Sequence, residues 1–596
     1  MIEKMRKYTF LIHHSDYEDF LAALQKLGMV HIVKNTAEKT DKLEETQKEI
    51  EAYTEAITFM RKYITPQSTK KTTTLHALQL RQEIDKAHLE RERLTLQSNV
   101  LAKEIAELSP WGEFDYDLYK KLADYGLQLS LFICSKYNFK PEWQQQYALR
   151  IINEVGHQIY FAVLHEIDEP CQIEAESFKL PPTALAELKK EEAEVLESLK
   201  EIDTFYKENA LTAIELFTDE LKRLSHLYEY EEATLQGIKE ADNQVIILQG
   251  WIPQRQEDNL LQLLQQSEVV YLAEDAKAED NPPVLLRNNW FVRNFEIIGD
   301  MFMLPYYNEL DMTPFFAPFY LMFFGFCDGD AGYGVIMILL GWLIKKKYKS
   351  PGVQRFLTLI QILGAGTIVM GFVMGSFLAY DLKNIPFLNP YIPIRNTGQI
   401  FNFALLLGVI QIVTGKLINV YKRMKQSGIV HGISTLGITI FVVSLAIAGS
   451  TLLGAKPGRI LNYTSYGIYL GLVMIFFFNL PGKNIFLNFA NGLWIMYGVF
   501  TGFLGDLLSY IRLFALSVSG GILGIVINDM AHQFSAIPII GPVIFLLFMI
   551  GGHSLNIALS GLGAFIHPMR LTFVEFFNNS GFSGPGLRYQ PFGKIK

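Results

Sequence analysis

The chain has 596 residues, which leaves room for several domains. Its formal net charge of −8 argues against a nucleic-acid-binding protein. Hydrophobic residues make up 50% and aromatic residues 13% of the chain, and they are concentrated after Met312, which argues against a wholly soluble protein.

The soluble half is expected to begin with a β-α-β unit. Tyr8–His13 and Val30–Val33 have the pattern of strands. Between them, Tyr17–Leu27 has helical periodicity, with Asp16 as its expected N-cap and Gly28 as its C-terminal stop. The N-terminal stretch lacks the apolar core of a signal peptide, so this half is expected to stay in the cytoplasm.

Two coiled-coil arms are predicted, over about residues 37–108 and 183–238, because apolar residues recur there at heptad-like spacing among charged ones. A polar, threonine-rich run at Thr65–Thr74 interrupts the first arm. The apolar seam of the first arm is Leu43, Thr46, Ile50, Tyr53, Ile57, Met60, Ile64, Leu80, Ile84, Ala87, Leu94, Leu101, Ile105 and Leu108. That of the second is Leu185, Leu188, Val195, Leu199, Ile202, Tyr206, Phe217, Leu221, Leu224 and Tyr228.

Short strands and a helix surround the second arm. Strands are predicted at Leu127–Ser135 and Gln158–His165, between the two arms. After the second arm, a strand at Val245–Ile252, a helix at Gln254–Gln265 and a strand at Val269–Leu272 resemble the first unit, and belong either to the same lobe or to a second one. The fold predicted for residues 1–310 is an α+β domain of two small α/β lobes joined by long antiparallel helices.

The soluble half shows no catalytic constellation. His13-His14 is read as the end of a strand rather than as a metal site. The three cysteines are scattered without metal-site or disulfide spacing. No G-x-x-x-x-G-K-[ST] loop occurs, so we expect the chain not to be an enzyme by itself and to hold no metal or cofactor.

Residues 311–596 are expected to form an α-helical polytopic membrane domain. Eight apolar segments are predicted to span the bilayer, at about 314–327, 331–345, 355–380, 399–421, 430–454, 463–480, 490–530 and 538–575. The first two are short and flank the glycine-rich turn Asp328–Gly334. That turn could be mistaken for a phosphate-binding or calcium-binding loop. We predict instead that it allows close helix packing at a membrane hairpin.

Basic residues give the expected orientation, because they gather on the cytoplasmic side of a membrane protein. In an eight-span count one side carries Lys345, Lys346, Lys347, Lys349, Arg355, Lys416, Lys422, Arg423, Lys425, Lys483, Arg588, Lys594 and Lys596. The other side carries only Lys383, Arg395, Lys456 and Arg459. Both termini are therefore predicted to be cytoplasmic, in a multi-pass protein of the cell (inner) membrane.

The segment Ala490–Met530 is almost wholly apolar but contains Arg512, accompanied only by Asp506 and Asp529. A membrane arginine costs at least about 2.5 kcal/mol on insertion scales, so it usually has a task. As one helix the segment would be about 60 Å long, so it would be steeply tilted or extend beyond the bilayer. The face that carries Arg512 is mostly small or polar: Gly505, Ser509, Arg512, Leu516, Ser519 and Leu523.

The last apolar stretch, Gly541–Phe577, repeats this design. Helical spacing places one polar stripe on one face: His553, Asn556, Ser560, Gly563, His567 and Arg570. Two long membrane helices, each with a polar stripe and an arginine, suggest an ion path. The alternative is that these groups only form hydrogen bonds between helices.

Four stretches of the chain resemble one protein family. The Pro314–Phe319 run leading to Gly329–Gly334 looks like the first membrane hairpin of subunit I, also called subunit a, of V/A-type rotary ATPases. Ser509–Leu516 resembles that family's arginine helix, and Ala564–Phe576 resembles its last helix. Gly250–Pro253 is similar to a motif near the end of the family's soluble half.

The resemblance implies a static subunit beside a rotating ring of proteolipid subunits, each with a membrane carboxylate. Two half-channels would reach the ring from opposite sides, separated by an essential arginine that matches Arg512; Arg570 matches the second arginine of the family. A guanidinium stays protonated, so Arg512 would hold a ring carboxylate ionised and bar a leak without relaying protons itself. The implied partners are the proteolipid ring, the peripheral-stalk, central-stalk and ATPase-head subunits, and the lipid bilayer.

The acids of the half-channels stay open, because some relatives carry a glutamate where this chain has Ser560. The half-channel candidates are Asp506, Ser509, His553, Asn556, Ser560, His567 and Glu575. Asp506 could instead cap a helix or pair locally, and Glu575 could be an exposed acid at the cytoplasmic surface. Whether the ion is H⁺ or Na⁺, and whether the complex makes or consumes ATP, is also open.

Two other functions compete with the stator subunit. A secondary transporter with a cytoplasmic regulatory domain would need a substrate site at broken helices, and usually internal repeats, of which the membrane half shows no clear sign. A purely structural membrane anchor would tolerate replacement of Arg512 without loss of ion movement.

Overall fold

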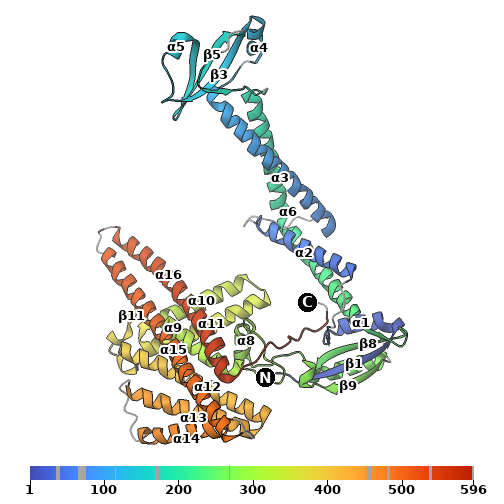
Figure 1. Ribbon diagram of the computed structural model, residues 1–596, viewed down its shortest axis with the longest axis vertical. Helices are drawn as coiled ribbons and strands as arrows, with labels where there is room; N and C mark the ends of the chain where they lie inside the picture. Colours follow the sequence, from blue (N-terminus) through green and yellow to red (C-terminus); the bar gives the residue numbers. More distant parts are fainter. Residues whose placement is uncertain are drawn as a thin grey trace. The chain divides into compact units, whose positions relative to one another are not determined.

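The computed structural model describes residues 1–593 except 35–39, 65–75, 115, 168–170, 172, 182, 268, 453–459, 480–483, 536, 537 and 539. The predicted break at Thr65–Thr74 and the loop charges Lys456, Arg459, Lys483, Lys594 and Lys596 lie outside the described residues. The chain forms two compact units (Figure 1). Met1–Val33 with Gly237–Phe592 make up one, and the other is mainly Lys34–Gln236.

The first lobe is a split β-α-β fold assembled from two distant parts of the chain. Its elements are β1 (Met5–His13), α1 (Tyr17–Leu27), β2 (His31–Ile32), β7 (Ile238–Glu240), β8 (Val245–Pro253), α7 (Glu257–Ser267) and β9 (Val270–Asp275). The strand order is β2-β8-β1-β9, with every neighbouring pair antiparallel and β7 paired to β8. The repeat seen in the sequence therefore completes the first lobe rather than forming another.

The helix α1 begins and ends at the predicted residues. Gly28 has φ of 66°, and its N–H donates to the Leu24 carbonyl at 3.0 Å, which ends the helix as expected. Asp16 occupies the N-cap position, but its side chain makes no capping hydrogen bond; its Oδ1 accepts from the Ser15 hydroxyl instead. Asp16 is therefore the N-cap residue, as predicted, but without a side-chain capping bond. His13 ends β1, as the strand-end interpretation expected.

A C-terminal segment docks on the first lobe. The Phe592 N–H donates to the Val30 carbonyl at 2.7 Å, which forms an isolated bridge beside β2. Farther back in the segment, the Val284 N–H donates to the Leu587 carbonyl at 2.7 Å. Residues near both ends of this compact unit, Val30 and Phe592, are therefore hydrogen-bonded to each other in the first lobe.

The second unit contains the predicted helical arms. α2 (Asp41–Arg61) and α3 (Ala77–Leu108) pack side by side with α6 (Leu185–Leu235), which has 51 residues and would be about 77 Å long (Figure 1). The packing is antiparallel, because Tyr53 contacts Phe217 whereas Arg91 pairs with Asp203. The seam is confirmed by burial of Leu43, Tyr53, Ile57, Met60, Leu80, Ile84, Leu94, Leu101, Leu108, Leu185, Leu188, Val195, Tyr206, Phe217 and Leu224.

The second unit also contains the second lobe. Its elements are α4 (Tyr116–Asp124), β3 (Leu127–Ser135), α5 (Trp143–Gln146), β4 (Ala148–Val155), β5 (Gln158–Glu166) and β6 (Glu176–Phe178). The strand order is β4-β5-β3-β6. β3 and β5 were predicted, whereas β4 and β6 were not.

Each of the eight predicted membrane segments contains a helix, although the third was predicted to reach residue 380 and its helix ends at Met374. The helices are α9 (Thr313–Asp328), α10 (Ala331–Lys347), α11 (Pro351–Met374), α12 (Thr397–Ser427), α13 (Ile429–Leu452), α14 (Ile460–Phe477), α15 (Ile485–Ser535) and α16 (Gly541–Arg570). Before them lies α8 (Trp290–Asp300), and the hairpin β10 (Ser376–Phe377) and β11 (Tyr380–Asp381) joins α11 to α12.

The prediction of eight full spans is not confirmed. Among the residues that the structure describes, five helices are long and apolar enough to cross a membrane: α11, α12, α13, α15 and α16. The pair α9 and α10 together has the required length but bends by 115°, which gives up to six spans. The apolar part of α14 is shorter.

The glycine-rich turn joins α9 to α10 and packs tightly on α11. A Cβ at Gly334 would lie 2.5 Å from the Gly364 carbonyl oxygen, and one at Gly325 would lie 2.6 Å from that of Gly366. One at Gly371 would lie 2.1 Å from the Ala331 nitrogen. The sequence interpretation of this turn as close helix packing is therefore confirmed.

We expect Gly371→Ala to lower stability, because the added methyl meets the backbone of Ala331, which cannot rotate away. Overpacking of this kind costs about 1–3 kcal/mol or more. Gly352→Ala is the matched control on α11, since a Cβ there meets nothing within 4 Å. Thermal unfolding of the purified protein in detergent measures the difference. Equal unfolding midpoints for the two variants would contradict the close contact.

Candidate functional site

The candidate site lies on α15 and α16, which pack against each other and against α9. After α16 the chain continues through a π-helical turn, Leu571–Phe576, into α17 (Phe577–Ser580). The polar side chains of these helices fall into three groups. We describe the arginines first, and then the polar groups on either side of them.

Neither arginine has a hydrogen-bond or ion-pair partner in the described part of the chain. Arg512 is half-buried on α15, and Arg570 is exposed at the end of α16. The positive charges of Arg512 and Arg570 both interact electrostatically with His567, so both guanidinium groups lie near this side chain. The Nδ1 atom of His567 is buried without a hydrogen-bond partner among the described residues.

A group of acids lies on one side of the arginines. Asn579 Nδ2 donates to Asp506 Oδ2 at 2.7 Å and to the Glu575 carbonyl at 2.7 Å. The charges of Lys416, from α12, and of Glu575 both act on Asp506. Nearby, the Tyr510 hydroxyl donates to Gln411 Oε1 at 2.7 Å. We call these residues the acidic group: Gln411, Lys416, Asp506, Tyr510, Glu575 and Asn579.

One of the alternatives for this group is wrong. Glu575 is 3% exposed and its Oε2 has no hydrogen-bond partner among the described residues, so it is not an ordinary exposed acid. Asp506 accepts a hydrogen bond from the side chain of Asn579, which is 73 residues away in sequence, so pairing within the chain stays an alternative to a transport role.

A closed hydrogen-bond network lies on the other side of the arginines. His553 Nε2 is 2.9 Å from Asn528 Oδ1, and its Nδ1 is 2.8 Å from the Tyr333 hydroxyl. Asn528 Nδ2 donates to the Leu378 carbonyl, so its oxygen faces His553 and Nε2 carries the proton. Asn556 Nδ2 donates to the Tyr333 oxygen at 2.8 Å, which satisfies the network.

Next to this network, two acids occupy the turn between α9 and α10. The Ser560 hydroxyl donates to Asp328 Oδ1 at 2.8 Å. Ser560 therefore faces a carboxylate supplied by another helix. Asp330 Oδ1 accepts from the N–H groups of Gly332 at 2.8 Å, Tyr333 at 3.3 Å and Leu378 at 2.7 Å. Its Oδ2 accepts from the Ser376 hydroxyl and the Ala379 N–H, each at 2.6 Å.

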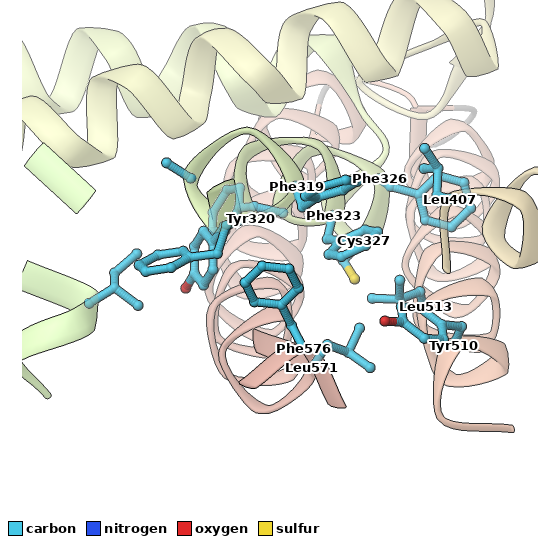
Figure 2. Close-up of a cluster of buried hydrophobic side chains, with 14 of the residues drawn as sticks. Phe319, Tyr320, Phe323, Phe326, Cys327, Leu407, Tyr510, Leu513, Leu571 and Phe576 are labelled. Atoms are coloured by element: carbon cyan, nitrogen blue, oxygen red, sulfur yellow. The ribbon is translucent and has the colours of Figure 1, made fainter. Parts of the chain in front are cut away.

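An apolar layer separates the acidic group from this network. Figure 2 shows Phe323, Phe326 and Cys327 of α9 gathered with Leu513 of α15 and with Leu571. These side chains are at most 2% exposed. On α15, Asp506 and Asn528 lie about 33 Å apart along the axis, close to the hydrocarbon thickness of a bilayer. Arg512 lies between them, about 9 Å along the axis from Asp506.

The predicted site residues thus divide into three sets. His567 lies near Arg512 and Arg570, Asp506 lies near Glu575, and His553, Asn556 and Ser560 face α9 and α10. Ser509 joins none of them, because its hydroxyl donates to the Gly505 carbonyl of its own helix at 3.3 Å. Asp529 is exposed.

Sequence reasoning missed several polar residues, most of which lie outside α15 and α16. They are Asp328, Asp330, Tyr333, Gln411, Lys416, Asn528 and Asn579. The available signal for the first two was a pair of carboxylates inside an apolar hairpin, where an acid is costly.

Comparison with known proteins identifies the family. A model of the V-type ATPase 116 kDa subunit family matches residues 13–381. The A-type ATP synthase subunit I of Methanocaldococcus jannaschii is 26% identical over 68% of this chain and 62% of its own length. That of Pyrococcus horikoshii is 31% identical over 58% of this chain and 53% of its own length. The V-type ATP synthase subunit I of Borreliella burgdorferi is 25% identical over 100% of both chains.

The chain spans less than two thirds of the first two relatives. The crystal structure of the cytoplasmic N-terminal domain of subunit I, a homologue of subunit a of V-ATPase, matches 45% of this chain and 100% of its own, with 17% identity and a TM-score of 0.20. The family match covers more than half of the chain. The chain therefore belongs to the V-type ATPase 116 kDa subunit family.

Proposed function

We propose that this chain is the non-catalytic membrane stator subunit of a V/A-type rotary ATPase or ATP synthase. In this role it forms two half-channels for H⁺ (or Na⁺) beside a rotating proteolipid ring, and it links the membrane sector to peripheral stalks. The observation that carries the proposal is the position of Arg512 between two polar groups, without a carboxylate partner among the described residues.

The energetics of Arg512 support an acidic partner on another chain. A charged side chain in a bilayer costs at least about 2.5 kcal/mol and is usually paired with an opposite charge. A carboxylate that arrives on a ring subunit would supply that pair and would lose its bound ion on meeting the guanidinium. The next carboxylate would repeat the exchange, while Arg512 keeps its proton throughout.

The surface of α15 and α16 supports close approach by such a ring. Only 28% of the most apolar window of α15, and 11% of that of α16, is buried within the chain. A Cβ at Gly505, Gly521 or Gly561 would meet nothing within 4 Å, so another helix could approach the backbone closely. Lipid would cover the rest of this apolar surface.

The acidic group and the network around His553 fit the two half-channels. Each lies on one side of the apolar layer, which would keep water from connecting them. Under this proposal Asp506, Glu575 and Lys416 line one half-channel, and His553, Asn556 and Ser560 line the other. His567 and Arg570 would lie near Arg512, between the two.

The soluble part fits a cytoplasmic connector. Its arm of about 77 Å is long enough to reach subunits well outside the bilayer. We propose that residues 1–310 form a cytoplasmic domain and residues 311–596 the membrane domain, with both termini cytoplasmic and the protein in the cell (inner) membrane. The partners would be the proteolipid ring and the peripheral-stalk, central-stalk and ATPase-head subunits.

Affinity purification from native membranes tests this function. We expect a tagged chain to bring down a proteolipid and ATPase-head subunits in constant ratio, with ATP hydrolysis in the eluate. Membrane vesicles from the same cells should take up ions when ATP is added. Recovery of the chain alone, with ion movement that does not depend on ATP, would instead favour a secondary transporter.

A further inference from the structure

The buried acid Asp328 has one free oxygen. It is the last residue of α9, and it is 3% exposed. Oδ1 accepts the hydrogen bond from Ser560, whereas Oδ2 has no hydrogen-bond partner among the residues that the structure describes. A buried carboxylate with an unsatisfied oxygen is costly, so such a group in a native fold calls for an explanation.

The neighbouring acid Asp330 has the opposite character. Its two oxygens accept five hydrogen bonds, four from backbone N–H groups and one from Ser376. A proton could bind Asp330 only if some of these hydrogen bonds broke. Of the two acids in the turn, only Asp328 is free to gain and lose a proton without changing the backbone around it.

A cavity of about 200 Å³ leads to Asp328. Its polar lining includes Asp328, Tyr333, Ser376, Asp381, Lys383 and Ser517. This space is large enough for several water molecules, and its polar walls offer them hydrogen bonds. It extends from the loop between α11 and α12 to the stretch of α15 at Ser517–Ile522, which begins five residues after Arg512.

We propose that Asp328 carries protons between this cavity and the region of Arg512, which makes it the relay acid of one half-channel. The inference rests on the proposed function and adds a residue that the sequence motifs did not point to. A hydronium ion in the cavity would give its proton to the Asp328 carboxylate, leaving water and a neutral carboxylic acid. The acid would then pass the proton to water or to a ring carboxylate beside Arg512 and return to its charged form.

The surroundings of Oδ2 favour a proton over a metal cation. A dehydrated hard cation needs several oxygen ligands, whereas a proton needs one acceptor. Oδ2 has no polar protein atom within hydrogen-bond distance in the described part of the chain. The neutral acid would also be less costly than the carboxylate in this buried place.

The experiment is ATP-driven proton uptake by vesicles that contain the complete complex with Asp328→Asn. Asparagine has nearly the same shape but binds no proton, so we expect uptake to fall at least tenfold with subunit content unchanged. Asp529→Asn is the matched control, because Asp529 is an exposed acid of α15 that does not line this cavity. That variant should keep uptake within about twofold of the unaltered complex.

Asp328→Glu keeps the acid and moves it by one methylene group. We expect this variant to transport protons with a shifted dependence of rate on pH, which a purely structural residue would not produce. The other titratable or charged groups around Asp328 would stay the same: Cys327, Asp330, Tyr333, Tyr380, Asp381, Lys383 and His553. If the complex with Asp328→Asn does not assemble, the pH dependence of transport by Asp328→Glu alone decides whether Asp328 carries protons.

Several results would overturn the proposal. One is uptake by Asp328→Asn within twofold of the unaltered complex, and another is an unshifted pH dependence in Asp328→Glu. Uptake of Na⁺ in place of protons by the unaltered complex would also do so. If Arg512→Ala blocks uptake and Asp328→Asn does not, only the role of Asp328 fails; if neither variant matters, the proposed function fails as well.

Discussion

Vesicles that carry Arg512→Ala are expected to lose ATP-driven ion uptake by at least a hundredfold. The guanidinium lies half-buried on α15 without a partner in the described chain, so its charge is available to an acid from outside. An ion pair at about 4 Å in an effective dielectric near 20 is worth about 4 kcal/mol. Without this ion pair the ring carboxylate would keep its bound ion, and rotation of the ring would no longer release the ion.

The measurement needs a check on assembly and a matched variant. Subunit content of the purified complex should be unchanged, because the Arg512 side chain makes no hydrogen bond or ion pair with any residue that the structure describes. Arg395→Ala is the control, since Arg395 is exposed in the loop that precedes α12. Arg512→Lys keeps the charge but not the planar fork, and should restore little uptake. Normal uptake with alanine at position 512 would remove this residue from the mechanism and favour a structural anchor.

Asp330→Ala is expected to prevent folding of the membrane hairpin. The carboxylate holds the turn at Leu378 and Ala379, whose φ angles of 49° and 60° are unfavourable for side chains with a Cβ. Without it, four backbone donors and the Ser376 hydroxyl lose their acceptor. Each buried donor without a hydrogen-bond acceptor lowers the free energy of unfolding by about 1–3 kcal/mol. The total free energy of unfolding of a typical domain is about 5–15 kcal/mol.

Yield and thermal unfolding of the detergent-solubilised protein measure this effect. We expect little Asp330→Ala protein in the membrane, and we expect Asp330→Asn to recover part of the yield because the amide oxygen still accepts. Asp381→Asn is the control, because this acid accepts a hydrogen bond from the Lys383 N–H, lies 4.0 Å from Lys383 Nζ and is at the surface. An Asp330→Ala protein with the unfolding midpoint of the unaltered chain would show that other contacts hold the turn.

Local patterns predicted the elements whose structure is decided locally. α1 begins and ends where its flanking residues indicated, and the heptad spacing gave the buried seam of α2, α3 and α6. The sheet order was out of reach, since β1 pairs with β8 across more than 230 residues of intervening chain. β4 was missed because most of its residues are exposed and it shows no clear alternation.

The same limit applies to the candidate site. Helical spacing correctly put Arg512, His553, Asn556 and Ser560 on two helices of the membrane half. It could not show that Asn579 reaches Asp506, because that contact depends on how α17 packs against α12. Glu575 is buried partly because the π-helical turn after α16 changes which side chains face inward.

The split first lobe also sets an order of events during synthesis. The ribosome finishes β1 about 230 residues before β8, which at 5–20 residues per second means a wait of roughly 12–46 s. Throughout that time β1 and β2 have apolar faces but no neighbouring strand. The segment that pairs with Val30 emerges later still, after α16. A nascent chain therefore keeps its earliest strands unpaired until β8 has been made, and keeps Val30 without its bridge partner until Phe592 follows.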